Sequence, residues 1–230
     1  MREIVLDTET TGFDPEAGDR IVEIGAVELN NHLPTGKTFH KYINPQRDMP
    51  ESAFQVHGLS TDFLADKPVF AAIAQEFVDF IGDSPLVIHN ASFDMKFLNF
   101  ELKTAAYPQI PYARAIDTLL IARNKFPGAG NSLDALCRRF GVDNSAREKH
   151  GALLDSEILA EVYLELVGGR QPDLTLATAS GAGQSAALVR KVGQRPSPLP
   201  PRITVEETAA HTEFTAKLGE NSIWSQRLKP

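Results

Sequence analysis

Glu3-Ile-Val-Leu-Asp7-Thr-Glu9-Thr-Thr-Gly12 is the stretch that decides the fold of this 230-residue chain. Its apolar, β-branched start predicts a strand close to the N-terminus. Side chains along a strand alternate between two faces, so Asp7 and Glu9 share one face and Thr8 lies on the other. Two adjacent carboxylates repel each other unless a cation lies between them, and oxygen ligands suit Mg²⁺ or Mn²⁺. An isolated pair of this kind is also common at the solvated end of a strand.

Strands and helices alternate from this stretch to about residue 169. Residues 20–29 and 37–43 are predicted strands, and the turn residues between them favour a hairpin, so the first three strands should be antiparallel neighbours. Apolar residues at helical spacing predict a helix over 69–81, closed by Gly82, and residues 86–88 predict a buried strand. Strands first, then strands interleaved with helices, predict an α/β fold with a mixed sheet flanked by helices.

Three further helices are predicted in the second half of this region. Ser92 is expected to be the N-cap of a helix that carries Phe93 and Phe97, and Ser132 the N-cap of another. Residues 116–121 are apolar and ambiguous between strand and helix. A last helix should carry the apolar residues of 158–166 and end at the glycines 168–169.

Two other groups of polar residues follow these elements. His89-Asn-Ala-Ser-Phe-Asp94 runs from the buried strand into a helix, which places Asp94 in the first helical turn, where acids are also common for dipole reasons. In His150-Gly-Ala-Leu-Leu-Asp155, a spacing of five would turn the two side chains about 140° apart on one helix. We therefore expect His150 on a mobile loop and Asp155 on the helix. Taken singly, each of these residues is also compatible with an ordinary surface position.

Together, the four carboxylates and the histidine resemble the DEDD exonuclease superfamily, in its histidine-bearing branch. Asp7 and Glu9 match the first motif, Asp94 the second, and His150 with Asp155 the third. The resemblance covers residues 1–169. It implies a ribonuclease H-like fold, a five-stranded mixed sheet flanked by helices, and metal-dependent 3′→5′ exonuclease activity.

The chemistry of this family explains why such residues are needed. A phosphodiester is anionic, and two divalent cations can bind it, activate a water and stabilise the leaving oxygen. Our hypothesis makes Asp7 the bridging ligand, with Glu9 and Asp155 completing one metal site. Asp94 would support the second cation through water, and His150 would be the general base that takes the proton from the attacking water.

Candidate substrate contacts surround these five residues. The backbone of Thr10, Thr11 and Gly12 is expected to embrace the terminal nucleotide. Phe54-Gln-Val-His57-Gly resembles the family's element beside that nucleotide, so His57 should approach its sugar or phosphate, and Ser52 stands where relatives often have an acid. Asn90 and Phe93 would line the pocket, with Phe93 offering a stacking face. Asp7, Glu9 and Asp155 are expected to touch the substrate as well.

The overall charge fits an enzyme that is brought to nucleic acid by a partner. Residues 1–169 hold 15 Lys and Arg against 25 Asp and Glu, and the whole chain has a net charge of −7. A protein that binds duplex DNA by itself is usually basic. The single Cys137 excludes an internal disulfide. With no apolar run long enough for a bilayer, the sequence indicates a cytoplasmic protein without a membrane contact.

The composition changes after residue 169. Residues 177–205 are rich in Ala, Gly, Ser and Pro and hold basic but no acidic residues, which predicts a flexible linker. This linker either is a plain tether or contacts DNA phosphates. Thr204-Val-Glu-Glu has the pattern of a capping box. The amphipathic helix that follows, within residues 206–224, should dock on a partner through Phe214, Leu218 and Trp224.

This tail makes the chain similar to the polymerase-associated proofreaders of the family. The similarity implies three partners: the 3′ end of single-stranded DNA, the polymerase subunit that holds the C-terminal helix, and a small accessory subunit. Residues 170–176 resemble a clamp-binding peptide anchored by Gln171, Leu174 and Leu176, although Pro172 departs from the usual residue. Two alternatives stay open: a stand-alone exonuclease for RNA or short oligonucleotides, and a non-catalytic structural subunit of a polymerase.

Overall fold

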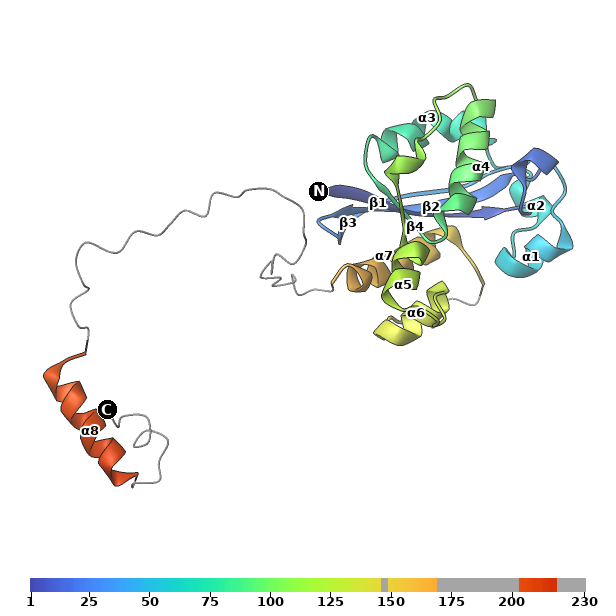
Figure 1. The fold of residues 1–230 in the computed structure, drawn as a ribbon. Coiled ribbons are helices and arrows are strands. Elements are labelled where there is room, and N and C mark those ends of the chain that lie inside the picture. The colour runs from blue at the N-terminus through green and yellow to red at the C-terminus, as the bar shows by residue number, and fades with distance from the viewer. Residues whose placement is uncertain (146–148, 169–202, 219–230) are drawn as a thin grey trace, which may run out of the picture. The chain divides into compact units, whose positions relative to one another are not determined.

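The computed structural model describes residues 1–145, 149–168 and 203–218 of the chain (Figure 1). The last of these ranges belongs to a separate unit of the chain. The strands are β1 (Arg2–Thr10), β2 (Ile21–Asn30), β3 (Leu33–Tyr42), β4 (Leu86–Ile88) and β5 (Ala115–Asp117). The helices are α1 (Glu51–His57), α2 (Thr61–Leu64), α3 (Phe70–Ile81), α4 (Ala91–Thr104), α5 (Thr118–Lys125), α6 (Leu133–Phe140), α7 (Ala152–Leu166) and α8 (Val205–Lys217).

The five strands form one mixed sheet in the order β3-β2-β1-β4-β5. β2 is antiparallel to both β1 and β3, whereas β4 is parallel to β1 and β5 is parallel to β4. The predicted mixed sheet and antiparallel hairpin are therefore confirmed. β3 begins at Leu33, four residues earlier than the sequence predicts, because Asn31 and His32 adopt φ values of 51° and 64° and complete a two-residue turn. Such a turn matches the twist of the flanking strands.

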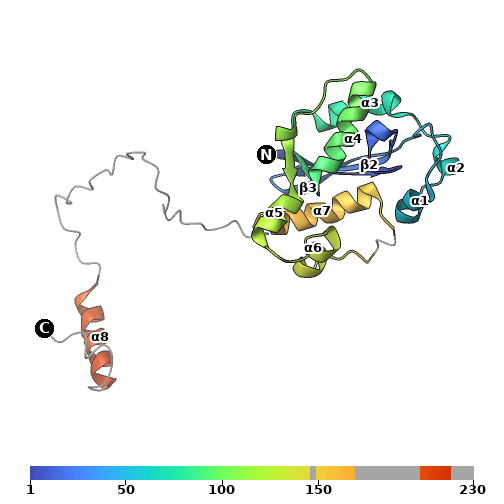
Figure 2. The same ribbon diagram turned by 45° about the vertical axis from the view of Figure 1, so that its right-hand side comes forward.

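Helices cover both faces of the sheet (Figures 1 and 2). Ile4 and Leu6 of β1 pack with the side chains of α3 and α4 in the larger hydrophobic cluster. Val5, between them, packs on the opposite face with Leu159 and Tyr163 of α7. Because strand side chains alternate, Asp7 and Glu9 continue the face of Val5 toward α7, and Thr8 continues the face toward α4.

Glycine allows α7 to lie unusually close to the sheet. A β-carbon added at Gly25 of β2 would come within 2.1 to 2.3 Å of backbone atoms of Ala152 and Leu153. The hydroxyl of Ser156 donates a hydrogen bond to the Gly25 carbonyl at 2.9 Å, which fixes the helix at this point. Since Gly25 is the β2 residue opposite Asp7, the first turn of α7 is brought next to the first acid of the site.

The structure corrects one predicted helix start. α4 begins at Ala91, and its N-cap residue is Asn90, which adopts a left-handed conformation with φ 68° and makes no side-chain capping bond. Ser92 lies inside the helix, because Asn90 tolerates the left-handed conformation that turns the chain directly from β4 into α4. The cap at Ser132 is confirmed: its hydroxyl accepts a hydrogen bond from the amide of Ala135 at 3.3 Å.

The ambiguous apolar run over 116–121 divides between two elements. Ile116 lies in β5, and residues from Thr118 onward form α5. The side chain of Asp117 caps this helix by accepting hydrogen bonds from the amides of Leu119 and Leu120. The amide of Asn90 also donates to Asp117, at 3.3 Å, so this one carboxylate ties together the starts of α4 and α5.

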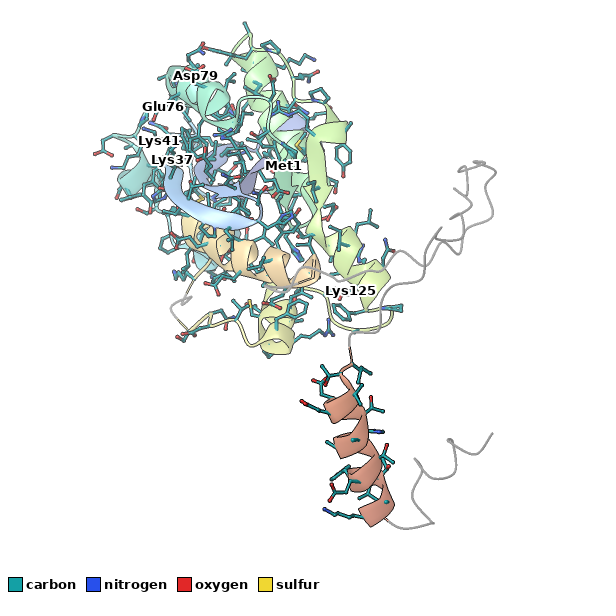
Figure 3. The ribbon with its side chains drawn as sticks, turned by 90° about the vertical axis from the view of Figure 1, so that its left-hand side faces the viewer. Met1, Lys37, Lys41, Glu76, Asp79 and Lys125 are labelled. Carbon is teal, nitrogen blue, oxygen red and sulfur yellow. The ribbon has the colours of Figure 1, made fainter. Side chains whose placement is uncertain are left out.

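Charged residues protect the β3 edge of the sheet. β3 is one of the two edge strands, and most of its side chains are exposed. Lys37 and Lys41 project from it toward the side of α3, where Glu76 and Asp79 lie (Figure 3). The ammonium group of Lys41 forms an ion pair with Glu76 at 2.9 Å. Lysines on an edge strand discourage pairing with another chain.

The C-terminal unit contains one described helix, α8. The predicted capping box is present: the Thr204 hydroxyl accepts from the amide of Glu207 at 3.1 Å, and the Glu207 carboxylate accepts from the amide of Thr204 at 2.8 Å. Val205 and Phe214 are exposed by 86% and 60%, so α8 buries no apolar face of its own within the described residues. Among the described helices, none has the length and apolarity that crossing a bilayer requires.

Candidate active site

β1 and β4 run parallel and end at the same edge of the sheet, and a cleft of about 730 Å³ opens there. All five residues singled out from the sequence line it: Asp7 and Glu9 from β1, Asp94 from α4, His150 from the loop before α7, and Asp155 from α7 itself. The structure therefore brings into one cleft residues that lie up to 148 positions apart in the sequence.

Glu9, His150 and Asp155 form the tightest part of this group. One ligand atom from each lies within 4.8 Å of the others, a spacing that suits a bound metal ion. Glu9 and Asp155 are buried, whereas half of the His150 side chain is exposed. The Nδ1 atom of His150 lies 3.4 Å from a carboxylate oxygen of Asp155. The expectation that His150 lies on a loop and Asp155 on the helix is confirmed, and Asp155 is found in the first turn.

Asp94 reaches the cleft from the other face of β1. Its carboxylate accepts a hydrogen bond of 2.7 Å from the hydroxyl of Thr8, and it is 3% exposed. Burial raises the pKa of Asp94 to about 7, although the bond from Thr8 acts in the opposite direction. The sequence placed Thr8 on the face opposite Asp7 and Glu9, but did not reveal that this face holds Asp94.

The donor set fits divalent cations. Five carboxyl groups line this cleft, and three of them are buried, an arrangement that is costly without a compensating positive charge. Hard, oxygen-rich sites of this kind suit Mg²⁺ or Mn²⁺. Asp7, Glu9 and Asp155 would hold such ions directly, and Asp94 offers a fourth carboxylate once its proton is lost.

Lowering the pH below about 7 is expected to weaken the binding of Mn²⁺, because Asp94 then holds a proton that must leave before its carboxylate can act. Each further pH unit should cost up to about tenfold in affinity, and the affinity should level off at higher pH. Thr8→Val removes the bond that favours the charged carboxylate and should move this curve to higher pH. Calorimetric titration with Mn²⁺ over a pH series measures both effects.

Thr104→Val is the matched control for this titration, because the Thr104 hydroxyl donates only to the Phe100 carbonyl within α4. Its Mn²⁺ affinity should depend on pH in the same way as that of the unaltered chain. An affinity that is independent of pH between about 5.5 and 8 would contradict the role assigned to Asp94.

A second cavity of about 210 Å³ adjoins the cleft and shares Thr8, Glu9, Phe13 and Phe93 with it. Of the candidate substrate contacts, this cavity is lined by Thr10, Gly12, Ser52, His57 and Phe93, and the cleft by Asn90 and Phe93. Thr11 lines neither. It is 1% exposed, and its amide donates a hydrogen bond to the Arg20 carbonyl at 2.9 Å. Its N–H group is therefore used within the protein.

His57 points a nitrogen into this region without a good partner. Its Nδ1 atom accepts a hydrogen bond from the amide of Leu59 at 3.1 Å, which places the proton of the neutral ring on Nε2. The buried Nε2 atom makes no hydrogen bond of standard geometry with the described residues. Burial lowers the pKa of His57, and an interaction with the Thr10 backbone opposes this shift only in part. The neutral ring thus offers an N–H donor to a ligand.

α1 is linked directly to the loop that carries His150. The amide of His150 donates to the Val56 carbonyl at 3.3 Å. Next to it, the ammonium group of Lys149 lies 5.0 Å from the centre of the Phe54 ring. Val56 also lines the second cavity. The wall of that cavity and the position of the imidazole therefore depend on the same short helix.

Sequence reasoning missed several residues of the site. Phe13 is 85% exposed, lines both cavities, and lies edge-on to Phe93 with ring centres 6.4 Å apart. An aromatic residue in a polar turn directly after the acids was the available signal. Arg123 lines the cleft from α5, and only the folded chain brings it there. No sequence pattern marked Gly25, because its role is to leave space.

Part of the predicted tail lies outside the described residues. This applies to the clamp-binding anchors Gln171, Leu174 and Leu176, to Trp224, and to most of the linker over 177–205. Phe214 and Leu218 are described, and both are exposed on the C-terminal unit.

The comparisons with known proteins agree with this geometry. The exonuclease family model matches residues 4–163. The chain is 51% identical to a Rickettsia felis protein named DNA polymerase III subunit epsilon, with 95% of this chain and 97% of that protein covered. It is 44% identical to the protein of that name from Escherichia coli strain K12, with 97% of both covered.

Solved structures share the fold. The nuclease domain of 3′hExo, described as a DEDDh family member bound to rAMP, superimposes with a TM-score of 0.63 at 23% identity, covering 72% of this chain and 91% of that one. Exonuclease X in complex with 5′ overhanging duplex DNA gives a TM-score of 0.54 at 24% identity, with 71% and 90% covered. The chain belongs to the exonuclease family and, within it, to the group of DNA polymerase III epsilon subunits.

Proposed function

We propose that this chain is the proofreading 3′→5′ exonuclease of a bacterial replicative polymerase, which removes mispaired 3′-terminal nucleotides from DNA in the cytoplasm. The observation that carries the proposal is the convergence of Glu9, His150 and Asp155 within 4.8 Å, in a cleft that Asp7 and Asp94 also line. The relationship to epsilon subunits extends over 95% of the chain and therefore includes the tail, which an exonuclease acting alone would not need.

The side chains divide the hydrolytic step between them. Two divalent cations, when bound, would neutralise the phosphate, activate a water molecule and stabilise the leaving 3′ oxygen. Asp7 would bridge them, Glu9 and Asp155 would complete one site, and Asp94 would support the other through water. His150 takes the proton from the attacking water. The Asp155 carboxylate lies next to Nδ1 of His150 and favours the tautomer that has its proton on Nδ1. The other ring nitrogen, Nε2, would then be the base.

The second cavity would receive the terminal nucleotide. Phe93 and Phe13 offer ring faces and edges to its base. The Nε2–H group of His57 would donate to its sugar or phosphate, and Ser52 and the backbone of Thr10 and Gly12 would close the pocket. A single unpaired nucleotide can be drawn into such a pocket, whereas a nucleotide held in a base pair must first be released.

A mispaired 3′ end provides the direct test of this function. The full chain should shorten a primer with a mismatched end in Mg²⁺ or Mn²⁺, should act more slowly on the matched primer, and should be inactive in EDTA. Asp155→Asn is the control for a contaminating nuclease, because it removes a ligand charge and keeps the size of the side chain. Activity that persists in EDTA or in the Asp155→Asn protein would contradict the proposed mechanism.

The C-terminal unit would attach the enzyme to its polymerase. α8 exposes Phe214 and Leu218 and has no apolar core to cover them within the described residues, so a groove on the polymerase subunit fits the helix and Trp224 beyond it. Residues 170–176 would bind the sliding clamp, and a small accessory subunit would complete the assembly. A truncated chain without residues 206–230 should fail to capture the polymerase subunit and should keep its hydrolytic activity, whereas retained capture would contradict docking through α8.

Two other functions make different predictions. A stand-alone exonuclease for RNA or short oligonucleotides would degrade those substrates without any need for the tail. A structural subunit would bind the polymerase and leave a mismatched primer intact even with metal present. The buried cluster of carboxylates disfavours the structural role, because such a cluster stabilises nothing without a ligand.

A further inference from the structure

Arg123 is the one Lys or Arg among the described residues that line the 730 Å³ cleft, which also holds five acidic side chains. It lies in the last turn of α5 and is exposed. Within the described part of the chain, no hydrogen bond or ion pair joins Arg123 to a carboxylate of the cleft. An unpaired guanidinium in an acidic cleft is available for an anionic ligand.

Arg123 lies outside the second cavity, which is the one proposed to receive the terminal nucleotide. That cavity is lined by residues of α1 and of the turn after β1, and none of its lining comes from α5 or α6. α1 and α5 lie on different sides of the start of α7 in both ribbon views (Figures 1 and 2). The cavity shares Glu9 with the cleft, whereas Arg123 lines only the cleft, in the arm that α5 and α6 contribute to.

The surroundings of Arg123 suit a sugar-phosphate chain. His89 lies beside it, fixed by a contact of 2.9 Å between its Nδ1 atom and the Thr118 hydroxyl. Burial lowers the pKa of His89, although the charge of Asp117 and a hydrogen bond with the Asn131 backbone act in the opposite direction, so Arg123 is the main positive charge of this arm. Leu119 and Leu133 add apolar surface along the same arm.

A strand with its terminal nucleotide in the cavity and its scissile phosphate at the acids must leave through the remaining arm. We propose that Arg123 binds the next phosphate of that strand, the one on the 5′ side of the penultimate nucleotide. This inference rests on the proposed function. It assigns the α5–α6 arm to the upstream strand and makes Arg123 a binding residue that senses whether a substrate is longer than a dinucleotide.

A pair of trinucleotides that differ in one charge tests the assignment. In the first, thymidine trinucleotide, both phosphates are native; in the second, the phosphate nearer the 5′ end is a neutral methylphosphonate. Release of the 3′-terminal nucleotide by the full chain in Mn²⁺ should be roughly tenfold more efficient with the native trinucleotide, mainly through a lower KM. Arg123→Ala should reduce this preference to about twofold or less, and Arg123→Lys should retain part of it.

Arg138→Ala is the matched control, because Arg138 is an exposed arginine of α6 that does not line the cleft. It should keep the preference of the unaltered chain. The proposal is overturned if Arg123→Ala keeps the preference, if it slows both substrates equally, or if Arg138→Ala loses the preference as well. A full chain that cleaves neither trinucleotide would overturn the proposed function, and this inference with it.

Discussion

Replacing Gly25 by alanine is expected to lower kcat/KM on DNA by more than about 100-fold and to destabilise the fold. The new methyl group would come within 2.1 to 2.3 Å of backbone atoms of Ala152 and Leu153, which cannot rotate away as a side chain can. The start of α7 must therefore move outward, and it carries Asp155 and the adjoining His150 with it. A displacement of about 1 Å at a catalytic group is enough to cost about 100-fold.

Stability should change together with activity. The Gly25 carbonyl would also lose the 2.9 Å hydrogen bond from Ser156. Overpacking of this kind costs roughly 1–3 kcal/mol, which corresponds to a melting temperature lower by about 2–12 °C. Gly130→Ala is the control, because the nearest atom to its added carbon is the Ala135 β-carbon at 3.4 Å. The melting temperature and kcat/KM are measured for both variants. Equal values for Gly25→Ala and Gly130→Ala would refute the steric explanation.

Replacing His150 by alanine should lower kcat by about 10²–10⁴-fold, the usual contribution of a general base. The imidazole is half exposed and lies at the edge of the carboxylate group, so its removal should leave the melting temperature and the affinity for Mn²⁺ nearly unchanged. This separation distinguishes a base from a metal ligand, whose loss would weaken Mn²⁺ binding. Steady-state kinetics and calorimetry on the same protein sample provide both values.

Added imidazole offers a second readout for His150. In the His150→Ala protein, free imidazole can enter the vacated, solvent-exposed position and restore part of the rate, with a dependence on pH that follows its neutral form. Asp155→Asn should show no such recovery, because its defect lies in metal binding. A His150→Ala enzyme that stays within about threefold of the original rate would rule out the base.

The sequence predicted the parts of the site that depend on local periodicity. The two-residue repeat of β1 placed Asp7 and Glu9 on one face. His150 and Asp155 could not share a face of one helix, so His150 was placed before α7 and Asp155 on it. Those expectations needed only the geometry of single elements. The assignment of a mixed sheet followed in the same way from the order of strands and helices.

Contacts between distant elements could not be predicted in this way. The bond from Thr8 to Asp94 joins positions 86 residues apart, and the arrival of Arg123 in the cleft depends on how α5 packs. The helix start at Ser92 was wrong because serine is the commoner capping residue, whereas the tight turn out of β4 requires the left-handed conformation that Asn90 adopts. Tertiary geometry outweighed local preference at that point.

The hydrogen bond between the Val56 carbonyl and the amide of His150 has a consequence for enzyme kinetics. Val56 lines the nucleotide cavity, so any substitution in α1 that reshapes the cavity also shifts the loop of the imidazole. Variants of this wall will therefore alter KM and kcat together. Selecting α1 variants for a new substrate is therefore expected to change the reaction rate at the same time.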